Sequence, residues 1–234
     1  MKVENILTEE GYIRRIGGGV LYTPKGKKLK NDIEEVIRKQ LNKIHAKEVE
    51  FPMLVDYDKV PMDDFIKRGR RAQCMRVSLL EKRQFYLVRT CEELAAAYYQ
   101  QQGLSECIIY QIKTKFRDEP KETLDFLKRN EFQMVDIYSF EQAKNRYYDQ
   151  IRTSFIHICR ELGLSIEIKE SEEFRGQGTI SEEFYSLLNG KKVEIGHIYN
   201  FSDYYAKPFQ AEFQMGSYGL GVDRLFACFV ISAC

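Results

Sequence analysis

The sequence predicts an α+β domain in which a mostly antiparallel β-sheet is flanked by helices. Four segments have helical periodicity, over residues 32–44, 92–102, 141–162 and 221–231. Five shorter segments are strand-like, over residues 48–51, 108–116, 132–138, 192–201 and 211–215. The segments at 108–116 and 132–138 are expected to pair as antiparallel neighbours. Strands that pair as neighbours, with helices packed against them, favour the α+β class.

The boundaries of these elements can be read from punctuating residues. Pro52 ends the strand before it, and Gly103 and Gly163 follow the second and third helices. The run KGKKLK at 25–30 is either a local basic patch or the solvated start of a helix or loop. The first helix has acidic residues early, basic residues late and an apolar stripe on one face, formed by Ile33, Val36, Ile37, Leu41 and Ile44.

The composition predicts a single domain over residues 1–234, because no repeat or linker interrupts the chain. Apolar residues make up 44%, enough for a substantial core. With 36 basic and 35 acidic side chains, the net charge of +1 argues against binding nucleic acid by bulk charge alone. The scattered cysteines form no C-x-x-C pair, so we expect no zinc site and a reducing compartment. No leader or membrane span is evident, so we expect a soluble, cytoplasmic protein.

The first candidate site cluster is Arg117-Asp118-Glu119, at the end of a predicted strand. An Arg and a Glu two residues apart on a strand point to the same face. The planar guanidinium of Arg117 suits a phosphate, and Glu119 suits an adenine amino group. Phe132, on the returning strand, is placed to stack on the base. The alternative is an ordinary salt bridge at a strand end.

The second cluster is the glycine-rich segment GSYGLGVDR, residues 216–224. Its order G-x-x-G-x-G differs from the dinucleotide fingerprint and lacks the ribose-binding acid, so a Rossmann fold is rejected. Glycines between a strand and a helix let a ligand approach the backbone closely. Arg224, one turn into the helix, is within reach of a terminal phosphate. The alternative is a tightly packed strand–helix junction.

The third cluster is Thr90-Cys91-Glu92, just before an apolar helix. In isolation, Thr90 is interpreted as an N-cap and Glu92 as a first-turn acid.

Together, the three clusters resemble the signature motifs of class II aminoacyl-tRNA synthetases, and their flanks resemble prolyl-tRNA synthetases. The helix through IHAKEVEFP resembles motif 1 (about residues 32–52), which forms the dimer interface in that family. KFRDEPKETLDFLKRNEFQMVDIYSF resembles motif 2 (about 108–140), and QMGSYGLGVDRL resembles motif 3 (about 211–231). VEIGHIYNFSDYYA resembles the strand that lines the proline pocket. The resemblance implies a class II catalytic domain and a homodimer.

The resemblance also implies a role for each candidate residue. Arg117 and Arg224 are the catalytic pair: Arg117 holds the α-phosphate and the substrate carboxylate, and Arg224 faces the γ-phosphate. The implied ATP-binding residues are Arg117, Glu119, Lys128, Phe132, Glu194 and Arg224, with Phe132 and Arg224 sandwiching adenine and Glu194 facing Mg²⁺. The implied amino-acid-binding residues are Thr90, Glu92, Arg117, His197, Tyr199 and Ser217. An amino-acid carboxylate is already ionised at pH 7, so such chemistry needs positioning and charge neutralisation rather than a general base.

Four residues depart from the family pattern. Lys128 stands where motif 2 has Arg or His, which keeps the charge and loses the bidentate geometry. Asn130 stands where Arg is usual. Arg89 precedes the T-x-E loop in place of Pro, and Cys91 is the middle residue of that loop.

The largest departure is length, because only about 50 residues separate Phe140 from Glu194, too few for a bacterial editing domain between motifs 2 and 3. We also expect no anticodon-binding domain after Arg224. We therefore expect an excised catalytic domain or a paralogue that does not read tRNA. The resemblance implies activation of proline, or a close analogue, by ATP and Mg²⁺, with transfer to tRNA. Two alternatives stay open: delivery to a carrier protein or small molecule, and a catalytically silent module that binds an amino acid.

Overall fold

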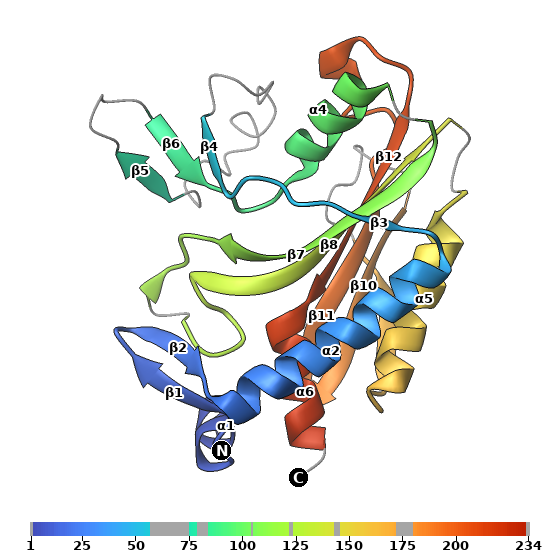
Figure 1. The fold of residues 1–234 in the computed structure, drawn as a ribbon. Helices are drawn as coiled ribbons and strands as arrows, with labels where there is room; N and C mark the ends of the chain where they lie inside the picture. Colours follow the sequence, from blue (N-terminus) through green and yellow to red (C-terminus); the bar gives the residue numbers. More distant parts are fainter. Residues whose placement is uncertain are drawn as a thin grey trace.

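The centre of the structure is a seven-stranded sheet of order β3-β7-β8-β12-β11-β10-β9 (Figure 1). The computed structural model describes residues 2–56, 75–78, 84–103, 105–121, 124–142, 146–171 and 180–232. The strands are β3 (Lys47–Glu48), β7 (Cys107–Phe116), β8 (Glu131–Glu141), β9 (Ile166–Glu170), β10 (Ile180–Leu188), β11 (Lys191–Asn200) and β12 (Gln214–Gly221). Neighbours pair antiparallel except β3 and β7, which pair parallel. The predicted α+β class is confirmed.

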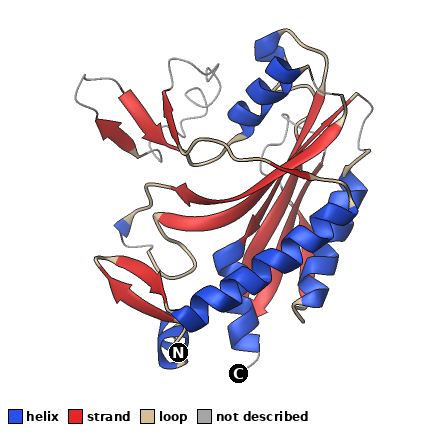
Figure 2. Ribbon diagram, viewed as in Figure 1, coloured by secondary structure: helices blue, strands red, loops and turns tan. Residues whose placement is uncertain are grey.

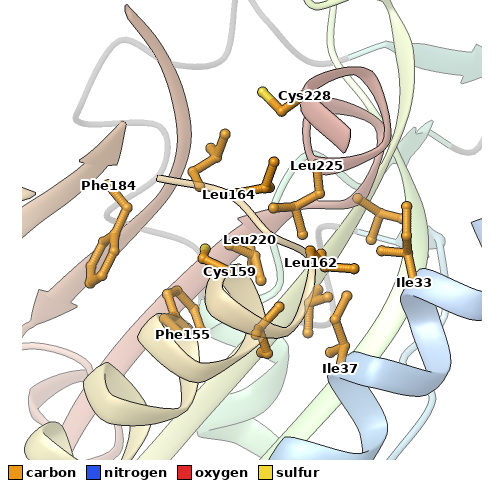
Figure 3. Close-up of a cluster of buried hydrophobic side chains, with 14 of the residues drawn as sticks. Ile33, Ile37, Phe155, Cys159, Leu162, Leu164, Phe184, Leu220, Leu225 and Cys228 are labelled. Atoms are coloured by element: carbon orange, nitrogen blue, oxygen red, sulfur yellow. The ribbon is translucent and has the colours of Figure 1, made fainter. Parts of the chain in front are cut away.

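Three helices cover one face of this sheet (Figures 1 and 2): α2 (Pro24–Lys43), α5 (Tyr148–Glu161) and α6 (Val222–Ser232). Figure 3 shows their buried side chains meeting, with Ile33 from α2, Phe155 from α5, Leu225 from α6 and Leu220 from β12. Burying such side chains is the main favourable contribution to folding. The helices thus hold the sheet from one side only.

A separate core lies on the opposite face, beneath α4 (Glu92–Gln102). Side chains along a strand alternate between faces, so β8 serves both cores. Val135 and Ile137 of β8 join the helix-side core, whereas Tyr138 and Phe140 join the core under α4. Tyr99 of α4 stacks on Phe140, with ring centroids 4.3 Å apart.

The remaining elements lie outside the main sheet. Helix α1 (Val3–Glu9) leads into the hairpin β1 (Ile13–Ile16) and β2 (Gly19–Tyr22). A three-stranded sheet contains β4 (Leu54–Asp56), β5 (Arg76–Ser78) and β6 (Gln84–Leu87), and a 3₁₀ turn spans Lys207–Phe209. The sequence analysis predicted none of these, because short segments carry little periodicity. It also missed β9 and β10 of the main sheet.

Helix α2 begins at Pro24, eight residues before the predicted start at 32. Thr23 is its N-cap, because the Thr23 hydroxyl accepts a hydrogen bond from the Gly26 N–H at 3.1 Å, and Pro24 suits the first turn. The basic run at 25–30 is therefore helical, which confirms the second of its two interpretations. Lys30, at the end of that run, is buried rather than solvated.

Three elements predicted around the sheet have the wrong boundaries. The helix predicted over 141–162 begins only at Tyr148, because β8 continues to Glu141, where it pairs with Gln214; residues 143–145 lie outside the described part. The strand predicted over 211–215 instead runs from Gln214 through the glycines to Gly221. Pairing with β8 on one side and β11 on the other outweighs the poor strand propensity of glycine. The strand predicted over 48–51 is only Lys47–Glu48.

The apolar stripe of α2 is buried within the chain itself. Ile33, Ile37 and Leu41 are at most 1% exposed, with Val36 and Ile44 packed against the same core. The stripe therefore needs no second subunit to cover it. The homodimer stays a prediction that rests on the resemblance of residues 32–52 to motif 1. Within the described ranges, no helix has the length and apolarity needed to cross a membrane.

A prediction concerns the start of α2, which lies directly against the chain before β1. A Cβ on Gly26 would lie 2.0 Å from the carbonyl oxygen of Tyr12. We expect Gly26→Ala to lower the free energy of unfolding by about 1–3 kcal/mol through overpacking, although Ala is the better helix former. Urea denaturation measures this.

The control is Gly19→Ala, because a Cβ there would meet only the Ile16 carbonyl oxygen, at 3.7 Å. We expect this control to change stability by less than about 0.5 kcal/mol. Equal losses in the two variants would contradict the close approach at Gly26.

Candidate active site

A cavity of about 510 Å³ lies at the sheet, bordered by α4, β8, β11, β12 and the β7–β8 connection. All the candidate residues predicted from the sequence line it: Thr90, Glu92, Arg117, Glu119, Lys128, Phe132, Glu194, His197, Tyr199, Ser217 and Arg224. They come from segments up to 134 positions apart in the sequence, from Thr90 to Arg224. The tertiary structure thus brings the three predicted clusters together in one place.

Arg117 and Glu119 lie just beyond β7, which ends at Phe116, so their predicted place at the end of a strand is confirmed. The alternation of side chains along a strand does not set their directions, because neither residue is part of the strand. They nevertheless face each other, with Arg117 Nη1 3.6 Å from Glu119 Oε1. The backbone explains this, because Asn130 holds both residues. The Arg117 N–H donates to the Asn130 carbonyl at 2.8 Å, and the Glu119 N–H donates to Asn130 Oδ1 at 3.3 Å.

Two further residues complete this group. Lys128 Nζ lies 3.2 Å from Glu119 Oε2, and the Arg117 guanidinium lies over the Phe132 ring, 5.2 Å from its centroid. The salt bridge named as the alternative is therefore present. It does not use all the hydrogen-bonding capacity of Arg117, because the buried Nε has no hydrogen-bond partner. Burial lowers the pKa of Arg117, although Glu119 opposes that shift. An unsatisfied buried cationic donor suits an incoming anion.

Arg224 lies in the first turn of α6 and holds Glu194 of β11. Arg224 Nη1 donates to the Glu194 carbonyl at 2.7 Å and lies 3.3 Å from Glu194 Oε2. The second carboxylate oxygen of Glu194 lies 3.5 Å from His197 Nδ1. Burial alone raises the pKa of Glu194, but the hydrogen bonds and charges of His197 and Arg224 outweigh it and lower the pKa to about 2. Glu194 is therefore ionised at neutral pH.

Thr90, Glu92 and Ser217 form a third group. The Thr90 hydroxyl donates to Glu92 Oε2, and the Ser217 hydroxyl donates to Glu92 Oε1 at 3.0 Å. The N-cap position of α4 is occupied by Cys91, not Thr90, and has no side-chain cap. The N-cap interpretation of Thr90 is therefore wrong. Glu92 is a first-turn residue of α4, as interpreted, and its carboxylate is also held at the cavity by hydroxyl groups from two segments.

His197 and Tyr199 form one wall. Their rings are stacked with centroids 4.6 Å apart and an angle of 19° between planes. His197 pairs with Gly219 across the β11–β12 ladder, and a Cβ on Gly219 would lie 2.6 Å from the imidazole atoms Cε1 and Nε2. Gly219 therefore makes room for the His197 ring. Gly216 is also closely packed, because a Cβ there would meet Tyr218 and Ser139, but it lies inside β12 rather than at the strand–helix junction.

A buried polar network below Cys91 was missed by the sequence analysis. Lys115 is fully buried, lies 2.5 Å from Asp136 Oδ2 and donates to Cys91 Sγ at 2.9 Å. Gln111 Nε2 donates to the same Asp136 oxygen at 3.0 Å. Burial raises the pKa of Cys91 to about 12, so its thiol stays neutral. Among the described residues, no three or more acidic, His or Cys side chains cluster in a way that could hold a metal ion by themselves.

Asp223 and Arg129 also line the cavity and were not predicted. The carboxylate of Asp223 forms an ion pair with Arg129. Sequence reasoning interprets an Asp at a helix start as a capping residue and an Arg in a loop as solvated. Only the spatial arrangement shows that they meet.

The family model described as the tRNA synthetase class II core domain (G, H, P, S and T) matches residues 76–232. The chain therefore belongs to the class II aminoacyl-tRNA synthetase core-domain family. The fold is that of an adenylate-forming catalytic domain.

Within this family the chain is similar to proline–tRNA ligases. It is 25% identical to the Ehrlichia chaffeensis enzyme over 94% of this chain and 68% of that protein. It is 30% identical to the Geobacillus kaustophilus enzyme over 88% of this chain and 37% of that protein. The prolyl-tRNA synthetase of Giardia lamblia, solved with prolyl-adenylate, superposes with a TM-score of 0.87 at 16% identity over 98% of this chain. The Cryptosporidium parvum enzyme, solved with halofuginone and AMPPNP, superposes with a TM-score of 0.84.

The chain spans only part of most of these proteins, with 37% of the Geobacillus enzyme and 52% of the Giardia chain covered.

A prediction tests the packing of His197 on Gly219. We expect Gly219→Ala to push the imidazole off Tyr199, because the new methyl group would occupy the position of the ring. The His197 Cε1–H proton resonance carries a ring-current shift from the stacked tyrosine, so it should move toward the position of an unstacked histidine. One-dimensional NMR measures this, because the chain has only three histidines.

The matched control is Gly221→Ala, whose Cβ would meet the Arg224 side chain at an ordinary 3.4 Å. Its His197 resonance should stay in place. A resonance unchanged in Gly219→Ala would contradict the stacked arrangement.

Proposed function

We propose that this chain activates proline with ATP to form prolyl-adenylate and passes the prolyl group to tRNA. The observation that carries the proposal is the gathering of two chemically different groups in one cavity. One group, around Arg117 and Arg224, suits phosphates and a purine. The other, around Glu92, suits an amino acid. Membership of the class II core-domain family supports the same chemistry.

The nucleotide group matches ATP in charge and shape. Arg117 offers a buried Nε without a partner to the α-phosphate and the amino-acid carboxylate. Arg224 and Lys128 supply further positive charge at the same cavity, and Glu119 accepts from the adenine amino group. The aromatic ring of Phe132, with Arg224, flanks the adenine. The Cryptosporidium neighbour was solved with AMPPNP, an ATP analogue, which supports this assignment.

The amino-acid group matches proline. The Glu92 carboxylate is held in place by Thr90 and Ser217 and faces the cavity, where it accepts from the protonated secondary amine. The stacked rings of His197 and Tyr199 provide a flat wall for the pyrrolidine ring. The Giardia neighbour was solved with prolyl-adenylate, which supports proline as the substrate.

The proposed reaction balances without a general base. A carboxylate oxygen of proline attacks the α-phosphorus of ATP, the bond from that phosphorus to the bridging oxygen of the β-phosphate breaks, and pyrophosphate leaves with its electrons. The arginines hold the reactants in line and neutralise the developing charge. Glu194, ionised and beside Arg224, fits Mg²⁺, which takes one or two protein carboxylates together with substrate phosphates. Bound there, the ion would neutralise phosphate charge.

The first prediction tests the activation step. We expect Mg²⁺-dependent exchange of pyrophosphate into ATP with proline and not with the other nineteen amino acids, and no need for tRNA. Arg117→Ala should lose a factor of about 10²–10³ in exchange rate, the usual cost of removing one preorganised donor from developing charge. Radiolabelled pyrophosphate exchange measures both.

The control variant is Arg152→Ala. Arg152 does not line the cavity, and its Nε lies 2.8 Å from Glu182 Oε2. This variant should exchange at nearly the normal rate. Absence of exchange with every amino acid, in folded protein that binds ATP, would sink the proposal in favour of a silent binding module. Exchange without charging of tRNA would instead favour delivery to a carrier protein or small molecule.

The second prediction tests the amino-acid group. Glu92→Gln removes the charge that faces the proline amine, and a buried charged hydrogen bond is worth about 1.5–3 kcal/mol. We therefore expect the KM for proline to rise at least about tenfold, with a much smaller change in the KM for ATP. Steady-state exchange kinetics measure both constants.

Asp149→Asn is the matched control, since Asp149 is also a first-turn acid, in α5. Loss of a first-turn acid costs only a few tenths of a kcal/mol in stability. If Glu92→Gln behaved like this control, with a slightly lower melting temperature and an unchanged KM, Glu92 would have no role in binding proline.

A further inference from the structure

Asp223, the second residue of α6, has four hydrogen-bond donors on one buried carboxylate. Tyr22 Oη and Lys30 Nζ donate to Oδ1 at 2.6 and 2.8 Å. The Gln133 N–H donates to Oδ2 at 2.8 Å, and Arg129 Nη2 donates to the same oxygen. The Asp223 side chain is only 5% exposed. Each oxygen of the buried carboxylate therefore accepts two hydrogen bonds.

The four donors come from four different segments. Tyr22 ends the β1–β2 hairpin, Lys30 lies in α2, Arg129 lies in the β7–β8 connection, and Gln133 lies near the start of β8. Burial opposes ionisation, but the charges of Arg129 and Lys30 outweigh it and hold the pKa of Asp223 below its usual value. Removing one partner of such a buried ion pair strongly destabilises a protein, because the other charge stays buried without a counter-charge.

Arg129 connects this carboxylate to the nucleotide group. Its neighbours in the sequence are Lys128, which pairs with Glu119, and Asn130, which holds the backbone N–H groups of Arg117 and Glu119. Displacing Arg129 would therefore release the residues on both sides of it.

The same connection is attached to the core and to α6 at two more points. Phe126 is 1% exposed and lies under the Arg129 guanidinium, 4.9 Å from the ring centroid. Arg224 Nε donates to the Leu127 carbonyl at 3.2 Å. Asp223 and Arg224, adjacent in the sequence, thus both hold residues 124–130. Both residues line the cavity, and the carboxylate of Asp223 is held there by its four donors, one of which is Arg129.

We propose that Asp223 is a positioning residue of the nucleotide site, which through Arg129 sets residues 124–130 so that Lys128, Glu119 and Arg117 face Arg224. It makes no contact with the reacting atoms. Tyr22 and Lys30 hold the carboxylate from the other side, so the N-terminal hairpin and α2 contribute to the geometry of the site. The effect on catalysis rests on the proposed function, whereas the effect on residues 124–130 does not.

The test is Asp223→Asn in the 234-residue chain. The amide nitrogen of Asn has no lone pair to accept from Arg129 and the Gln133 N–H, whereas its oxygen still accepts from Tyr22 and Lys30. Hydrogen exchange in the absence of ligand is measured over residues 124–131. We expect exchange there to be about tenfold faster, the usual effect of losing a hydrogen bond to a charged group. The KM for ATP should rise at least about tenfold, and the KM for proline less than about threefold.

Two variants of Arg129 distinguish a positioning role of Asp223 from a general loss of stability. Arg129→Met should reproduce the faster local exchange, and Arg129→Lys, which keeps the charge, should restore part of the protection. The double variant Asp223→Asn/Arg129→Met should exchange little faster than either single variant, because both substitutions remove the same interaction. The control is Glu182→Gln, which breaks a partly buried ion pair with Arg152 away from the cavity and should leave residues 124–131 unchanged.

Unchanged exchange over residues 124–131 in folded Asp223→Asn overturns the proposal, whatever the kinetics. Equal increases in the KM values for ATP and proline overturn it as well. If Asp223→Asn does not fold, Arg129→Met decides the question by the same exchange measurement: faster local exchange supports the proposal and unchanged exchange overturns it. If the wild-type chain activates no amino acid, the proposed function fails, and the exchange measurements still decide whether Asp223 positions residues 124–130.

Discussion

Strand β8 is hydrogen-bonded to β7 on one side and to β12 on the other, and the geometry of the site depends on this double pairing. Asp136 of β8 lies between Gln111 of β7 and Gly219 of β12 in the two registers. Because side chains alternate along each strand, a shift of one residue would turn the site-facing set toward the helices. The helices α2, α5 and α6 pack on one face, which leaves the other face for the cavity.

Paired charges are the second feature that the cavity depends on. A site for a polyanion needs several cations, and buried cations without partners are costly. Here the cations have acidic partners: Glu119 for Arg117 and Lys128, Glu194 for Arg224. The ion pairs hold the cations in place before any ligand arrives, and such preorganisation is what electrostatic catalysis requires. The ion pair of Arg129 with Asp223 is buried, and it joins the β7–β8 connection to α6.

The site residues that could be predicted from the sequence are those whose residue type and local spacing form a motif. Arg117, Glu119 and Arg224 belong to recognisable motifs, and all three line the cavity. Sequence reasoning missed Asp223 and Lys115, because a lone acid at a helix start and a lone lysine in a strand are usually solvated. It also ended β12 too early, since glycines predict a turn unless both neighbouring strands are known to pair with them.

The sequence by itself determined the α+β class, the family and part of the lining of the cavity, because periodicity and motif spacing are local properties that survive without a structure. Only the tertiary structure decided which polar groups meet: Tyr22, Lys30 and Arg129 all reach Asp223, although Tyr22 lies 201 residues away in the chain. It also decided that the apolar stripe of α2 is buried by the chain's own core. The physical reason is that ion pairing and burial depend on distances in space, which strand register and helix packing set together.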